Sequence, residues 1–274
     1  MAMLMRFPGG RRKALTLSYD DGRVYDARLA DIFNSHGLRS TFFICSGFMR
    51  PEDRAYDPAG YLSFSEARRV YEGHEIASHT VTHALIGDML PAGITDEVLE
   101  DRRRIEAETG RLVRGLAYPC GSMSESVFRV LRDNGLSYGR TNITSGGYKL
   151  PQDWYQWQFT CRHTDPKVMD YACAFLEDER PFGAASLFYL FGHSYEFPRD
   201  DNWQLIEEFA ALMGGHADIW YATNAEICDY TKAYRRLCVS VGETRVYNPS
   251  AMEVWVNIRG KNYAVAPGET KEIG

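Results

Sequence analysis

The sequence alternates between strand-like and helix-like segments at least six times, and this alternation limits the possible folds. Short apolar or alternating runs indicate strands, and apolar residues at helical spacing indicate helices. The predicted strands cover residues 14–19, 40–45, 113–117, 137–141, 185–191 and 219–221. The predicted helices cover residues 24–36, 95–109, 124–134, 166–177, 203–213 and 224–234, with a shorter one ending at residue 71. Repeated strand–helix units favour a parallel sheet with helical crossovers, so we predict an α/β fold, a distorted (β/α) barrel of about seven strands.

The pattern changes in the last forty or so residues of the 274-residue chain. Residues 142–164 are irregular and aromatic-rich, and they give no clear assignment, whereas short alternating runs at 238–241, 253–258 and 263–266 indicate β structure. We therefore expect a barrel domain over residues 1–235 and a small β extension over residues 236–274. Because so short an extension is marginal as an independent fold, we expect it to pack on the barrel or on a partner subunit in a homo-oligomer.

Composition excludes several classes of partner. A net charge of −6 gives no electrostatic basis for binding nucleic acid or an anionic membrane. No apolar stretch approaches the roughly 20 residues that span a bilayer, and the N-terminus lacks the apolar core of a secretion signal. The 6 cysteines are scattered without a Cys-x-x-Cys pair, which favours free thiols. Together these features predict a cytoplasmic protein.

Two of the 7 histidines, His79 and His83, are four residues apart. In a helical turn such residues share a face, so we expect both imidazoles to reach one metal ion. A metal site needs further ligands, and a hydrolytic one also needs an open position for water.

Paired carboxylates in Asp20-Asp21-Gly22 follow the first predicted strand, and His193 ends a later one. Active sites of barrels lie at these strand ends. Two adjacent carboxylates are costly to keep charged together unless a cation or a proton joins them. We therefore predict that Asp21 completes the metal site, that Asp20 is the base beside the metal-bound water, and that His193 is the acid.

With these motifs in order, the sequence resembles the polysaccharide deacetylase family, carbohydrate esterase family 4. The family's Thr-Phe-Asp-Asp-Gly appears here as Ser-Tyr-Asp-Asp-Gly at 18–22, and its His-Ser/Thr-x-x-His appears at 79–83. The resemblance implies a distorted (β/α) barrel and metal-dependent removal of acetyl groups from sugars. It assigns the base to Asp20, the metal ligands to Asp21, His79 and His83, and the acid to His193.

The third motif departs from the family's usual Arg-Pro-Pro-Tyr, because residues 117–120 read Ala-Tyr-Pro-Cys. Ala117 stands where an arginine would orient the base, and Cys120 stands where a tyrosine would offer its backbone N–H to the oxyanion. A backbone donor survives a side-chain change, so Cys120 keeps the oxyanion prediction. Arg140, at the next strand end, is the candidate replacement for the missing cation. The family includes branches with an Ala-Tyr-Pro third motif, and we place this chain among them.

The predicted function is a metal-dependent hydrolase that removes acetyl groups from an N- or O-acetylated sugar or oligosaccharide. The predicted metal is Zn²⁺, with Co²⁺, Mn²⁺ and Fe²⁺ as alternatives. Further candidate substrate contacts are Tyr118, Arg140, Trp154 and Tyr195. Three alternatives stay open: a C–N hydrolase acting on a non-sugar amide, a non-haem iron oxygenase using the same two histidines and one aspartate, and a carbohydrate-binding module without catalysis.

Overall fold

The computed structural model describes residues 3–178 and 183–273, and within them nine strands form one central sheet. Its neighbouring strands follow the order β7-β6-β5-β4-β3-β2-β9-β8, with β10 also beside β2, and every pairing is parallel. The strands are β2 (Lys13–Asp20), β3 (Ser40–Ile44), β4 (Glu75–Ser78), β5 (Gly115–Ala117), β6 (Tyr138–Thr144), β7 (Trp157–Phe159), β8 (Cys161–Arg162), β9 (Ser186–His193) and β10 (Ile219–Tyr221). The predicted α/β fold with a parallel sheet is confirmed.

The sheet curls towards a barrel through residues 157–162. At one end of this segment β7 pairs with β6, and at the other end β8 pairs with β9. Only Thr160 separates the two short strands, and its N–H donates to Tyr189 O at 2.8 Å. One stretch of chain thus bridges both ends of the strand order, which is the distortion expected of this barrel. Strands of three and two residues carry too little periodicity to be predicted from the sequence, so this segment had no clear assignment.

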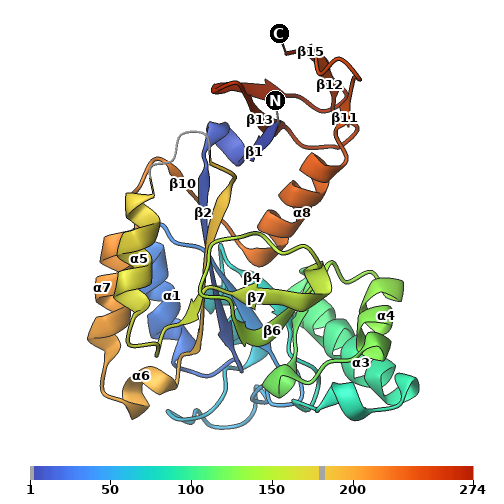
Figure 1. Ribbon diagram of the computed structural model, residues 1–274. Helices are drawn as coiled ribbons and strands as arrows, with labels where there is room; N and C mark the ends of the chain where they lie inside the picture. The colour runs from blue at the N-terminus through green and yellow to red at the C-terminus, as the bar shows by residue number, and fades with distance from the viewer. Residues whose placement is uncertain (1–2, 179–182, 274) are drawn as a thin grey trace.

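The helices cover the outside of the sheet, with α1, α5 and α7 grouped on one side and α3 and α4 on the other (Figure 1). Their bounds are α1 (Asp26–Ser35), α2 (Phe64–Val70), α3 (Pro91–Thr109), α4 (Glu125–Asp133), α5 (Val168–Glu177), α6 (Glu196–Arg199), α7 (Trp203–Met213) and α8 (Asn224–Arg235). Helix α3 begins at Pro91, one turn before the predicted start, because a proline fits the first helical turn. None of the helices in the described part of the chain is both long and apolar enough to cross a bilayer.

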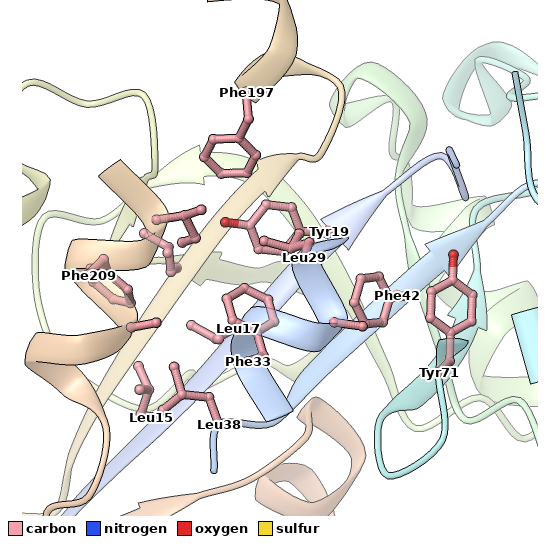
Figure 2. Close-up of a cluster of buried hydrophobic side chains, with 14 of the residues drawn as sticks. Leu15, Leu17, Tyr19, Leu29, Phe33, Leu38, Phe42, Tyr71, Phe197 and Phe209 are labelled. Carbon is pink, nitrogen blue, oxygen red and sulfur yellow. The ribbon is translucent and has the colours of Figure 1, made fainter. Parts of the chain in front are cut away.

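Strand β2 is buried along its whole length, and its two faces differ in chemistry. Leu15, Leu17 and Tyr19 pack against α1 and α7, where they meet Phe33 and Phe209 (Figure 2). Because side chains alternate along a strand, the residues between them point to the opposite face, inside the barrel. These residues are polar: Thr16, Ser18 and Asp20.

Hydrogen bonds satisfy this polar interior, as buried polar groups require. The Thr16 hydroxyl donates to Asn224 Oδ1 at 2.8 Å, and Tyr189 OH donates to Ser18 Oγ at 3.3 Å. Asp20 is the last of these inward-facing residues, so its carboxylate lies at the carboxyl end of β2.

The end of the chain forms two small antiparallel sheets near both termini (Figure 1). One has the strand order β1-β13-β14 and the other β11-β12-β15. Their bounds are β1 (Leu4–Arg6), β11 (Cys238–Val239), β12 (Arg245–Tyr247), β13 (Val254–Ile258), β14 (Lys261–Val265) and β15 (Thr270–Glu272). The extension therefore includes a strand from the start of the chain, which the sequence analysis did not predict because the pairing is long-range.

Tyr230 of α8 joins this extension to the barrel. Its buried hydroxyl donates to Arg6 O at 2.7 Å and accepts from Trp255 N at 2.8 Å. We predict that Tyr230→Phe removes both hydrogen bonds and lowers the free energy of unfolding by about 1–3 kcal/mol. Urea denaturation measures the change. Tyr247→Phe, at an exposed position, is the matched control and should change stability little. Equal midpoints for wild type and Tyr230→Phe would contradict this account.

Candidate active site

The register of the sheet brings the predicted site residues to one end of the barrel. Asp20, the last residue of β2, lies opposite His193, the last residue of β9. On the other side of β2, Ile44 of β3 pairs with Ser78 of β4, directly before His79. These are carboxyl ends of parallel strands, where barrels carry their chemistry.

Asp21, His79 and His83 form a compact cluster at this end. One ligand atom from each lies within 4.8 Å of the others. Asp21 Oδ1 is 3.7 Å from His79 Nε2 and 3.9 Å from His83 Nε2. The structure thus brings together the three residues that the sequence proposed as ligands.

The two histidines do not lie on a helical turn, so this part of the prediction is wrong. His79 follows β4 directly, and its N–H donates to Ile44 O at 2.9 Å. The next residues form a loop in which Thr80 and His83 have positive φ angles of 65° and 58°. Two left-handed residues turn the chain back on itself, and this places the second imidazole beside the first.

Backbone strain is concentrated in this region. Seven non-glycine residues in the described part of the chain have positive φ, and four of them lie in the cluster or in the turns at this end of the barrel. These four are Asp21, Thr80, His83 and Cys120. Such conformations cost about 1–3 kcal/mol each and persist where surrounding contacts enforce them. Here Asp101 of α3 is one such support, because its buried carboxylate accepts from Ser78 Oγ at 2.6 Å and from Ser46 N at 2.7 Å.

The chemistry of the cluster fits a divalent cation. His79 Nδ1 lies 2.8 Å from Ala117 O, and since that carbonyl can only accept, Nδ1 carries the proton. Burial lowers the pKa of His79, despite the opposing effect of Asp20 and Asp21, so the ring is neutral and Nε2 presents a lone pair. A lone pair that faces carboxylate oxygens calls for a cation between them. Two imidazoles and one carboxylate are a common donor set of catalytic zinc sites, and a carbonyl that orients the ring completes it.

Asp20 is held by a different group, the guanidinium of Arg140. Both Asp20 carboxylate oxygens accept from Arg140 Nη2, and each side chain is almost fully buried. Arg140 lies over the rings of Phe43 and Phe191. Burial alone would raise the pKa of Asp20, but the charge of Arg140 and its hydrogen bond, together with the charge of His193, lower it. Asp20 is therefore an ionised carboxylate beside the cluster, 3.6 Å from His79 Nε2.

His193 is held by Glu196, a residue that the sequence analysis missed. Glu196 Oε2 accepts from His193 N at 3.1 Å and lies 3.3 Å from His193 Nδ1. Arg162 Nη2 donates to the other oxygen of Glu196 at 3.0 Å. With Nδ1 turned to Glu196, Nε2 is the ring nitrogen left for the site. The available signal was a glutamate three residues after a histidine at a strand end. This spacing predicts a contact between the two side chains only if a helical turn follows the strand, as α6 does.

Glu196 also sets the electrostatics of this side of the site. Burial alone would raise the pKa of Glu196, but the hydrogen bond and charge of His193, with the charge of Arg162, bring it down to about 2. Burial likewise opposes the charged form of His193, yet the hydrogen bond to Glu196 and the charges of Asp20 and Asp21 raise its pKa. His163 is buried deeper and its pKa falls to about 4, mainly through desolvation, so it stays neutral at pH 7. His193 is thus the histidine of this group suited to hold a proton.

Cys120 lies at the end of β5 in a short turn, with a φ of 52° and an exposed side chain. Its carbonyl accepts from Asn142 Nδ2 at 3.0 Å. The next residue, Gly121, has a φ of 75°, and a Cβ there would lie 2.2 Å from Asn142 Oδ1, so glycine is required. The predicted oxyanion role of the Cys120 N–H stays a prediction.

The four predicted substrate contacts have different environments. The Tyr118 side chain is buried, and its hydroxyl donates to Tyr155 O at 2.7 Å. Trp154 is also buried, against Trp157, and Arg140 is engaged by Asp20 as described. Buried side chains offer little surface to a sugar, so we retain only Tyr195 as a proposed contact. It is half-buried, with its ring 5.2 Å from that of His193.

Comparison with known proteins relates the first half of the chain to one family. Residues 8–139 match the family model for polysaccharide deacetylases. The chain is 26% identical over 145 residues to a chitooligosaccharide deacetylase of Bradyrhizobium sp. (strain ANU 289), which is 52% of this chain and 59% of that protein. The match therefore spans less than two thirds of this curated relative.

Solved structures share the fold at low sequence identity. A Mycobacterium smegmatis protein, named as a candidate polysaccharide deacetylase, superposes with a TM-score of 0.60 at 17% identity, over 85% of this chain and 95% of that chain. A family 4 acetyl xylan esterase from Clostridium thermocellum, solved with a cobalt ion, gives a TM-score of 0.50 at 17% identity, over 81% and 92% of the two chains. The motif matches and this shared fold agree: residues 8–139 match the polysaccharide deacetylase family, and the chain has the fold of the solved structures named above.

Proposed function

We propose that this protein is a hydrolase that removes acetyl groups from an N- or O-acetylated carbohydrate and depends on a divalent metal. The observation that carries the proposal is the pairing of Asp20 with His193 across β2 and β9, beside the cluster of Asp21, His79 and His83. An ionised base and a protonated acid thus flank three metal ligands. The family match and the acetyl-removing activities named for its relatives support the same reaction.

The proposed metal is Zn²⁺, or another divalent ion such as the Co²⁺ named for the Clostridium thermocellum relative. Such an ion lowers the pKa of water and polarises an acetyl carbonyl. Asp20 would take the proton from the attacking water. The ion pair with Arg140 keeps the Asp20 carboxylate ionised and holds it on the guanidinium. Asp20 is then available as a base and is not required as a metal ligand.

The acid in this proposal is His193. Its proton on Nε2 would pass to the leaving amine or alcohol, while Nδ1 stays on Glu196. The backbone N–H of Cys120 would donate to the oxygen that becomes negative as water attacks the acetyl carbon. Each of these residues stands at the end of a rigid strand or in the turn after one, which favours fixed geometry.

Two alternatives use the same ligands. A non-haem iron oxygenase needs two histidines and one carboxylate but assigns no work to Asp20 or His193, whose supporting partners, Arg140 and Glu196, would then be unexplained. A C–N hydrolase acting on a non-sugar amide needs the same base and acid. Acetate release from acetylated oligosaccharides without oxygen consumption separates the proposal from both.

Substitutions divide the two aspartates by role. Asp21→Asn should lose bound metal, because one of three ligands is weakened. Asp20→Asn should keep the metal and lose about 10²–10⁴ in kcat, the usual contribution of a positioned base. Metal content by plasma mass spectrometry, with acetate release on the same samples, measures both effects. The assignment is reversed if Asp20→Asn loses the metal and Asp21→Asn keeps it.

The pH profile tests the His193–Glu196 pair. The acid must be protonated, so activity falls as pH rises through the pKa of His193. Removing the negative charge with Glu196→Gln removes an effect that raises this pKa, so the alkaline limb of kcat/KM should move to lower pH. Glu196→Asp should restore part of the shift, and Glu207→Gln, at an exposed ion pair, is the matched control. An alkaline limb that stays in place in Glu196→Gln would assign that limb to another group.

A further inference from the structure

A row of neighbouring aromatic and cationic side chains leads away from the proposed acid. The His193 and Tyr195 rings are 5.2 Å apart, and the Arg23 guanidinium lies 5.6 Å from the Tyr195 ring. The same guanidinium lies 4.6 Å from the Tyr61 ring, and the Phe48 ring is 5.4 Å from that of Tyr61. We call this set the stacking row. None of its members is fully buried, and Phe48 at its far end is 37% exposed.

The backbone holds the centre of the stacking row in place. Leu62 N donates to Gly22 O at 3.0 Å, and Val24 N donates to Gly60 O at 3.2 Å, so the chain on either side of Arg23 is tied to the loop that carries Tyr61. Arg23 Nη2 donates to Ala59 O. Arg23 directly follows the Asp-Asp-Gly motif. The backbone hydrogen bonds of Gly22 and Val24 and the contact with Ala59 therefore hold its guanidinium in place.

Arg23 has a charge that the protein does not neutralise locally. No carboxylate oxygen in residues 3–178 or 183–273 lies within 4.0 Å of its guanidinium nitrogens, and its Nε is buried without a hydrogen-bond partner. Other arginines on this side of the molecule are paired: Arg162 with Glu196, Arg199 with Asp200 and Arg28 with Glu207. An arginine that lacks a carboxylate at the edge of a site is suited to a carboxylate on a ligand.

We propose that the stacking row binds an acetylated oligosaccharide that carries carboxylate groups, and that Arg23 pairs with one of these carboxylates. The exposed parts of the Tyr195, Tyr61 and Phe48 rings offer apolar surface to successive sugar rings. The row begins at His193, so a chain bound along it would extend from the leaving-group side of the reaction. This inference rests on the proposed deacetylation and specifies its substrate class.

The test compares two acetylated tetrasaccharides with the same β-1,4 backbone. One contains only N-acetylglucosamine, and in the other alternate sugars are N-acetylmuramic acid, which adds a carboxylate. The wild type should show a kcat/KM about five- to tenfold higher for the acidic substrate, as expected for one partly desolvated charge pair. Added salt should reduce this preference. Arg23→Met should bring the ratio close to one, and Arg23→Lys should retain part of it.

Arg28→Met is the matched control, because Arg28 also lies over an aromatic ring, Trp203, but has a carboxylate partner, Glu207. It should keep the wild-type ratio. Phe48→Ser should raise KM more for a tetrasaccharide than for a single acetylated sugar. The proposal is overturned if the wild type has no preference for the acidic substrate, or if Arg23→Met lowers both rates by the same factor, which would indicate a purely structural contact with Ala59.

Calorimetric titration of Asp20→Asn with the same two tetrasaccharides separates this proposal from the proposed function. If neither sugar releases acetate from the wild type, the proposed reaction is wrong, and the affinity ratio still decides the role of Arg23. Tighter binding of the acidic tetrasaccharide, lost in Asp20→Asn combined with Arg23→Met, would support the stacking row as a site for acidic sugars. Equal affinities would reject it.

Discussion

The buried ion pair between Asp20 and Arg140 is the interaction on which the geometry of the site depends. Removing two charges from water is costly, and the pair repays this cost only with good geometry and further contacts. Arg140 has these contacts, because Phe43 and Phe191 face its guanidinium and its Nη1 donates to Thr141 O at 3.2 Å. The pair fixes a negative charge at the end of β2, beside the cluster of Asp21 and the two histidines.

The barrel explains how this pair can be buried. Strand β2 has one apolar face towards the helices and one polar face towards the interior, and the polar face ends in Asp20. The same register places His193 opposite Asp20 and Arg140 opposite Ala117. Without an arginine at position 117, the neighbouring strand supplies the cation. The departure from the usual third motif is thus accompanied by an equivalent charge one strand away.

Much of the fold followed from local pattern, because buried parallel strands and amphipathic helices leave clear periodic signals. The features that the sequence did not reveal depend on long-range contact or on very short elements. Strand β4 has only four residues and begins with the charged Glu75, so its sequence does not resemble a buried strand. Strand β1 forms only by pairing with β13, far along the chain.

The candidate site shows the same division. The Asp-Asp-Gly and His-x-x-x-His motifs identified the cluster, but the spacing suggested a helical turn where left-handed residues make a loop. A four-residue separation is compatible with both, so spacing alone cannot distinguish them. The position of Arg140 at a strand end made it a candidate cation, but its contact with Asp20 could be predicted only from the register of the sheet. The role of Glu196 could be predicted only by knowing that α6 follows His193. The burial of Tyr118 and Trp154 could not be predicted without the packing of the aromatic rings.

Anomalous diffraction from crystals grown with Zn²⁺, recorded above and below the zinc absorption edge, tests the central claim most directly. The account predicts one anomalous peak bonded to Asp21, His79 and His83, with the Asp20 carboxylate still on Arg140. A peak ligated by Asp20, or no peak within bonding distance of the two histidines, would contradict it.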